Sequence, residues 1–187
     1  MNETGIAWTA AAFVELLRKK IVPSAVRSPE QIGLCHPAER GDLGVTVWVY
    51  DIRECEELRS HTMRSIDGNR QRYPSCFVNL YCMITAYSPG DARYRSAEEQ
   101  KILEKSIQIS NDYGAIDMDL ESGKSAGRGP ACTISMLNLS IEEKLRIYGN
   151  TEQGYHTSLF YEIGPVEIKS ERIRQTTRVT HVIFDVE

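Results

Sequence analysis

The sequence predicts a single α/β (α+β) domain, in which about three helices flank a mixed or antiparallel sheet. Its 187 residues match the usual size of one domain. Two runs, at 45–50 and 76–87, are short and rich in β-branched and aromatic residues, which favours strands. Apolar residues recur at helical spacing elsewhere, first near the N-terminus. These three observations define the expected fold class.

The composition is that of a folded protein without a membrane span. Hydrophobic residues make up 41% and charged residues 26%, and the formal net charge of -4 argues against general nucleic-acid affinity. No run approaches the roughly 20 apolar residues that cross a bilayer, and the N-terminus lacks the basic start of a secretory signal. We therefore expect synthesis and folding in the cytoplasm, and no membrane partner.

The N-terminal segment predicts an amphipathic helix. Apolar residues recur at helical spacing from Ile6 to Ile21, and Pro23 then ends the helix. Prolines and glycines interrupt any period between residues 22 and 44. We expect an irregular connection there, with one short strand near 31–34.

A densely charged segment separates the two β-rich runs. Within it, Asp67-Gly68-Asn69 is a strong turn signal, because Gly accepts positive φ and Asp and Asn can bond to their own backbone. We therefore expect an extended charged hairpin, Arg59 to Arg72, that projects from a buried pair of strands.

The second half predicts two more helices. Ser96 with Glu99 three residues later has the pattern of a capping box, which favours a helix over 97–112. Ser140 and Glu143 repeat this pattern and open a shorter helix.

Loops and strands complete the chain. The Gly-rich run at 121–130 predicts a loop, and alternation at 132–137 predicts a strand. The remaining predicted strands are 156–163, 166–168 and the terminal 179–186, with a polar connection at 169–177.

No motif for catalysis or for a metal is found. The five cysteines are odd in number and never form a CxxC pair, which indicates neither a disulfide framework nor a zinc site. We expect Cys76 and Cys82 to lie buried on one strand face. Asp117 and Asp119 share a strand face but lack a third ligand, and with His156 they leave a small enzyme with dispersed residues open. No cofactor is expected.

The charged hairpin is the candidate functional region. Arginines combine there with glutamates, and the planar guanidinium forms bidentate pairs with carboxylates, as suits a protein interface. A small nucleic-acid-binding module that uses the same arginines is an alternative, although a nucleic-acid surface is more uniformly basic. A solvated hairpin with self-neutralising charges is a third interpretation.

The central part of the chain resembles the tail-terminator or cap proteins of bacterial contractile injection systems. The resemblance lies in residues 50–54 (YDIRE) and 57–60 (ELRS), the Arg-rich hairpin and the strand that ends at 84–87 (ITAY). These systems are phage-tail-like particles. The similarity continues in the helix that begins at Ser140 and in the run 159–166.

The resemblance implies a structural protein with no catalytic residues. In that family, six subunits form a ring that closes the distal end of the inner tube and sheath and stops polymerisation. The implied partners are the chain itself and the tube and sheath subunits. Assembly is expected in the cytoplasm, as part of a particle that is released or stays inside the cell.

On this basis residues 1–168 form the terminator-like domain, and 169–187 form a linker and a strand arm. The strand arm is expected to add to the edge of a sheath or neighbouring cap subunit. The interface residues expected are Arg53, Glu54, Glu57, Arg59, Arg64, Arg70 and Arg72 in the hairpin region, and Val179, Val182 and Phe184 in the strand arm.

Overall fold

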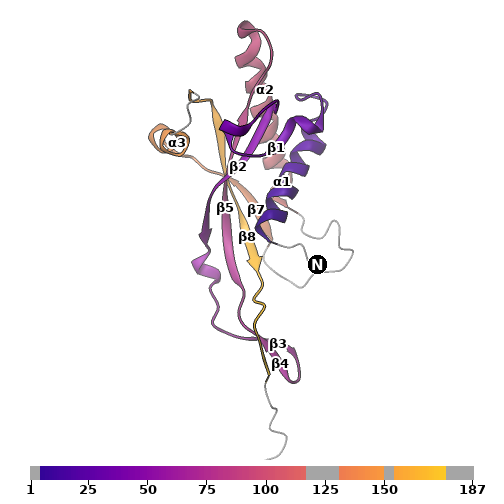
Figure 1. The fold of residues 1–187 in the computed structure, drawn as a ribbon, viewed down its shortest axis with the longest axis vertical. Helices are drawn as coiled ribbons and strands as arrows, with labels where there is room; N and C mark the ends of the chain where they lie inside the picture. The colour runs from indigo at the N-terminus through magenta and orange to yellow at the C-terminus, as the bar shows by residue number, and fades with distance from the viewer. Residues whose placement is uncertain (1–4, 117–130, 150–153, 176–187) are drawn as a thin grey trace, which may run out of the picture.

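Three long strands, β2 (Val45–Glu54), β5 (Cys76–Ala86) and β8 (Ser158–Ile168), lie side by side and form the centre of a six-stranded sheet (Figure 1). The strand order is β1-β2-β5-β8-β7-β6; β1 runs parallel to β2, and the other pairs are antiparallel. The short strands are β1 (Ile32–Leu34), β6 (Ala115–Ile116) and β7 (Cys132–Met136). This computed structural model describes residues 5–116, 131–149 and 154–175.

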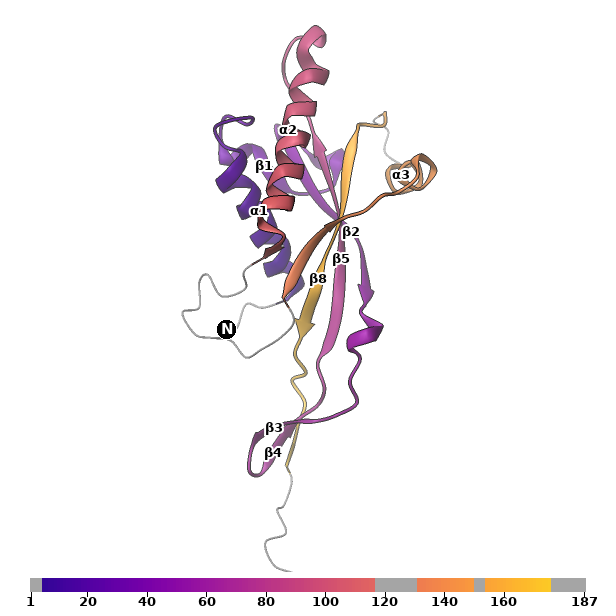
Figure 2. The same ribbon diagram turned by 180° about the vertical axis from the view of Figure 1, so that it is seen from behind.

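Helices cover both faces of the upper part of the sheet. The α-helices described are α1 (Ile6–Ile21), α2 (Ala92–Tyr113) and α3 (Ile141–Tyr148), and the 3-10 turns are η1 (Pro29–Gln31), η2 (Pro37–Glu39) and η3 (Glu56–Leu58). Figures 1 and 2 show α1 and α2 together on one side of the strands and α3 on the other. The predicted α+β domain with a mixed sheet and three helices is confirmed.

Two apolar layers follow from the alternation of side chains along the strands. On β5, Leu80, Cys82 and Ile84 pack with α1 and α2 in the main core. Met83 points the other way and packs with Phe160 and Tyr148, the last residue of α3. The sheet is therefore buried on both faces in its upper part.

The long strands continue below the helices and form an arm. β5 and β8 stay paired from Thr85 with Ser158 down to Cys76 with Ile168. Beyond that point a second, three-stranded sheet makes the tip of the arm (Figure 2). The tip sheet has the order β3-β4-β9 and consists of β3 (Arg64–Asp67), β4 (Arg70–Arg72) and β9 (Ile173–Gln175). The predicted hairpin and its turn at Gly68 are confirmed.

The predicted start of the second helix was wrong. α2 begins at Ala92, because the side chain of Asp91 accepts a hydrogen bond from the backbone N–H of Arg93 at 2.9 Å. Glu99 instead accepts from the backbone N–H of Ser88 at 3.1 Å. The capping box at Ser140 and Glu143 is confirmed, with both reciprocal hydrogen bonds present.

Three other local predictions differ from the structure. β8 runs on through Gly164 and Pro165, where the register shifts against β5, so the expected break is absent. β9 lies within the segment 169–177, which was expected to be a connection. Cys82 is buried as predicted, but Cys76 is exposed because it lies in the arm, below the helices that cover the sheet.

Candidate protein-interaction surface

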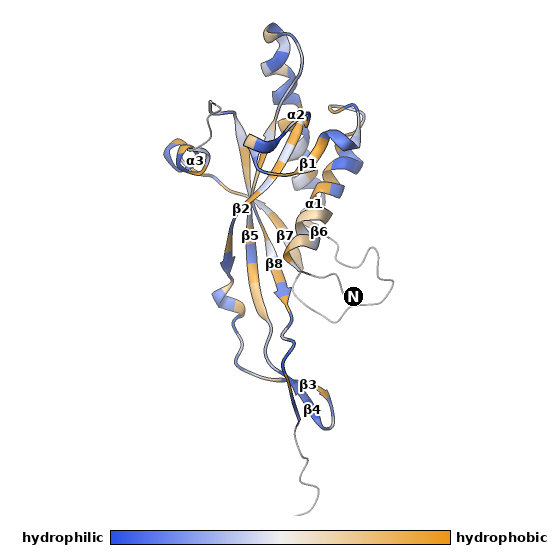
Figure 3. Ribbon diagram, viewed as in Figure 1, coloured by the Kyte–Doolittle hydropathy of each residue, from blue (hydrophilic) through white to orange (hydrophobic). Residues whose placement is uncertain are grey.

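The arm carries most of the predicted interface residues on the outside of the molecule. Arg53 and Glu54 end β2, Glu57 lies in η3, and Arg64 and Arg70 lie in the tip sheet. All five are exposed. Figure 3 shows the tip as mostly hydrophilic, whereas β5 and β8 above it carry apolar as well as polar stretches.

Two ion pairs hold the part of the arm next to η3. Arg59 donates from Nε and Nη2 to the two carboxylate oxygens of Glu54, at 2.9 and 2.5 Å. These hydrogen bonds hold the pKa of Glu54 below its usual range. Arg53 donates to Asp51 at 2.7 Å, and its guanidinium lies 4.7 Å from the ring centre of Tyr81.

Two further pairs hold the tip. Arg70 donates to Asp67 across the turn at 2.7 Å. Arg64 donates to Glu167 of β8 at 3.1 Å, and the Ser75 hydroxyl donates to the same carboxylate at 2.6 Å. The contact between Arg64 and Glu167 joins segments about a hundred residues apart, and it links the tip sheet to the end of the long strands.

The other cations of the tip have no carboxylate within 4 Å among the described residues. Arg72 and Arg174 belong to this group, as does Arg172, whose guanidinium lies 4.1 Å from the ring centre of Tyr73. The sequence reasoning did not include Arg172 and Arg174, because it placed them in a connection. Their only sequence signal was the dense run of charge at 169–174.

The structure thus divides the predicted charged set. Arg53, Glu54, Arg59, Arg64 and Arg70 pair with neighbours in the same chain, which agrees in part with the self-neutralising interpretation. Glu57 and Arg72 have no such partner among the described residues. Three predicted interface residues, Val179, Val182 and Phe184, lie outside the described residues. The Gly-rich loop, Asp117 and Asp119 also lie outside them.

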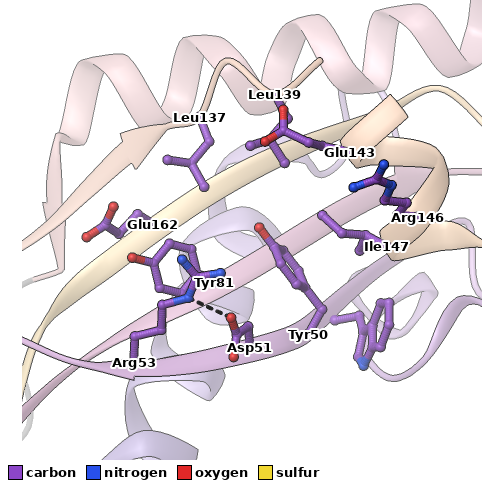
Figure 4. A pocket seen from close by; sticks show the side chains of 11 residues that line it. Tyr50, Asp51, Arg53, Tyr81, Leu137, Leu139, Glu143, Arg146, Ile147 and Glu162 are labelled. Atoms are coloured by element: carbon purple, nitrogen blue, oxygen red, sulfur yellow. Dashed lines mark hydrogen bonds and ion pairs between the residues drawn. The ribbon is translucent and has the colours of Figure 1, made fainter. Parts of the chain in front are cut away.

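A hollow of about 580 Å³ opens beside the arm, between the sheet and α3. Figure 4 shows Tyr50 and Tyr81 on its sheet side and Leu137 and Leu139 across from them, and Trp48 and Ile147 also line it. Burial raises the pKa of Tyr50 to about 12. No motif in the sequence marks this hollow, because its residues come from four separate segments.

A second hollow, of about 310 Å³, continues toward η3 and is lined by Glu57, Leu58 and Gly164. Glu162 lines both hollows, and it accepts a hydrogen bond from Asn79 at 2.6 Å. No cation lies within ion-pair distance of Glu57 or Glu162 in the described part of the chain.

The described residues show little sign of another kind of site. Within residues 5–116, 131–149 and 154–175, no three His, Cys, Asp or Glu side chains come together as metal ligands would. None of the described helices is both long enough and apolar enough to span a membrane. His156 packs against the ring of Tyr87, with 4.9 Å between ring centres.

The fold is that of the terminators of contractile injection systems. The sheath and tube terminator of the extracellular contractile injection system PVC, solved in the extended state, matches with a TM-score of 0.65 at 18% identity. The tube-terminating cap of the anti-feeding prophage matches with a TM-score of 0.66 at 16% identity. The matches cover 99% and 100% of this chain, but only 64% and 63% of those two proteins.

The particular family follows from the sequence. A family model described as the Pvc16 N-terminal domain matches residues 9–181, and the chain belongs to that family. None of the curated proteins matches the chain. The resemblance to the terminator family is thereby confirmed, and so is the fold class it implied.

Proposed function

We propose that this chain caps the distal end of a contractile injection particle, where it closes the inner tube and sheath and stops their growth. The observation that supports this most directly is the match to the Pvc16 N-terminal domain over 173 residues, 9 to 181. Two solved proteins with the same fold are described as a sheath/tube terminator and as a tube-terminating cap.

A terminator must present different surfaces to the filament and to the outside. A contact between two different surfaces repeats until something closes it, so a cap needs one face that fits the filament and another that offers no continuation. A ring closes in this way, and a ring of six is our expectation for this chain. The partners proposed are other copies of the chain and the tube and sheath subunits.

The arm is proposed as the docking element. It extends beyond the two-sided core and carries arginines and glutamates of both signs, which fix register and disfavour wrong partners more than they add affinity. Because Arg59 and Glu54 pair with each other, docking there would involve a neutral ion pair, whereas Arg72 has no carboxylate partner among the described residues. The terminal strand with Val179, Val182 and Phe184 is proposed to add to an edge of a neighbouring subunit.

Two further elements of the sequence prediction belong to this proposal. Residues 1–168 would act as the cap domain and 169–187 as the linker and strand arm, with β9 fixing the start of the linker to the tip. The particle would assemble in the cytoplasm, without catalysis and without a cofactor.

The test is a set of particles with altered caps. Charge reversal at Arg59, Arg64 and Arg72 together is expected to leave the fold intact, by circular dichroism, and to lower cap occupancy on particles seen by electron microscopy. As a control, Arg93→Glu with Arg95→Glu reverses two charges at the exposed start of α2. Normal length and normal cap occupancy with the triple variant would show that the hairpin does not dock.

A further inference from the structure

The arm is electrically divided along its length. The tip, defined here as residues 64–75 and 167–175, carries six cationic side chains against three carboxylates. The cations are Arg64, Arg70, Arg72, Lys169, Arg172 and Arg174, and the carboxylates are Asp67, Glu167 and Glu171. A tip with an excess of three positive charges, on a chain with a net charge of -4, favours an acidic partner surface.

The part of the arm next to η3 has the opposite charge. This region, called the shoulder, is residues 51–59 with Glu162, and it has five carboxylates against two arginines. The carboxylates are Asp51, Glu54, Glu56, Glu57 and Glu162, and the arginines are Arg53 and Arg59. The shoulder also contains the 310 Å³ hollow, whose acidic lining is Glu57 and Glu162.

Neither excess is neutralised within the described part of one chain. Arg72, Arg172 and Arg174 have no carboxylate within 4 Å, and neither Glu57 nor Glu162 has a cation within that distance. Among the described residues, the ion pair between the tip sheet and the long strands joins Arg64 to Glu167 of β8. Both residues belong to the tip as defined above, so this pair does not neutralise the shoulder. The two surfaces lie at different levels of one arm, with the tip beyond the shoulder (Figures 1 and 2).

We propose that the basic tip of one copy of the chain docks on the acidic shoulder of a second copy. The two surfaces differ, so the contact is heterologous and repeats from copy to copy until the assembly closes. The inference rests on the proposed ring and names its subunit contact. Charge complementarity selects the partner, and the hollow beside Glu57 supplies a concave seat for an arginine side chain.

A nucleic acid is a poorer fit to the tip. Proteins that bind single strands expose aromatic rings on which bases stack. The ring of Tyr73 is instead covered by the guanidinium of Arg172 at 4.1 Å, and a hydrogen bond of 3.3 Å joins the same two side chains. The tip sheet thus presents charge without a free stacking platform.

Charge-swapped variants test the contact with the full chain alone. The tip variant carries Arg172→Glu and Arg174→Glu, and the shoulder variant carries Glu56→Lys and Glu57→Lys. Each is expected to weaken self-association by about tenfold or more in sedimentation velocity, since attraction becomes repulsion at two positions. An equimolar mixture is expected to associate again, because each altered surface then meets an opposite charge on the other variant.

The controls separate this contact from general charge effects. Arg93→Glu with Arg95→Glu makes the same change in net charge as the tip variant, and it is expected to leave self-association as in the original chain. Added salt is expected to weaken the original chain's association, since exposed charges are screened.

Three results would overturn the proposal. The first is an original chain that stays monomeric at its highest soluble concentration, and the second is a mixture that associates no better than its components. The third is a tip variant that loses binding to a single-stranded oligonucleotide while its sedimentation is unchanged, which would assign the tip to nucleic acid. Filament length in a deletion strain tests the proposed cap function independently of these results.

Discussion

Gly164 of β8 lies directly against Asn79 of β5. A Cβ atom added to Gly164 would come within 2.3 Å of Asn79 Oδ1 and within 3.1 Å of its Cα. The Asn79 side chain cannot turn away freely, because it donates to Glu162 at 2.6 Å. We expect Gly164→Ala to lower the free energy of unfolding by about 1–3 kcal/mol in urea titrations, the usual cost of overpacking.

Gly68 provides the control for that substitution. A Cβ atom added there would meet nothing within 4 Å, and the residue lies in the exposed turn of the tip hairpin. Gly68→Ala is expected to change stability by no more than about 0.5 kcal/mol. Equal effects at the two glycines would contradict the close approach of β5 and β8.

Phe13 anchors α1 on the sheet. Its side chain is completely buried, and its ring meets the edge of the Tyr161 ring with 6.0 Å between centres. Phe13→Ala is expected to destabilise the protein by about 3–5 kcal/mol, because it leaves a cavity in the main core. Tyr94→Ala, at a side chain 63% exposed, should unfold at nearly the original urea concentration.

The two serines of the predicted capping boxes are expected to behave differently. Ser140 caps α3 and accepts from the backbone N–H of Glu143, so Ser140→Ala should lower stability by about 1 kcal/mol. Ser96 lies inside α2 and is exposed, so Ser96→Ala should be neutral or slightly stabilising, since Ala is the better helix former. Thermal unfolding of both variants measures the difference. An equal loss of stability in the two variants would indicate that Ser96 caps the helix after all.

Alkaline stability is expected to depend on Tyr50. Burial raises its pKa to about 12 from the model-compound value of 10. The unfolded chain therefore ionises first, so this contribution to stability is complete below pH 10 and is lost as the pH rises toward 12. Tyr50→Phe should lose less stability across that range than the original chain, and Tyr94→Phe should lose as much. Identical pH profiles for all three proteins would contradict the burial of Tyr50.

Elements with strong local signals were predictable from the sequence. The apolar period of the first helix, the turn at Gly68 and the capping box at Ser140 all act over a few residues, and the structure contains each of them. Glu99 shows where this reasoning fails. Its carboxylate bonds to Ser88, eleven residues away, and Asp91 takes over the cap.

The candidate surface was only half predictable. The high density of arginine in the hairpin indicated that this region is a candidate interface. The carboxylate with which each arginine pairs depends on the fold and was not predictable. Glu167 reaches Arg64 across 103 residues of sequence, and Arg172 and Arg174 join the surface only because β9 pairs with β4. The hollow beside α3 gave no signal, since Trp48, Leu137 and Arg146 meet there only after folding.

The long pairing of β5 with β8, interrupted only by the register shift at Gly164 and Pro165, also decides how the arm carries mechanical load. Their hydrogen bonds extend from the tip into the core between the helices. A pull along the arm would shear these bonds together, whereas a sideways pull would open them one at a time from Cys76 and Ile168. A protein anchored by its tip would therefore resist axial tension far better than bending.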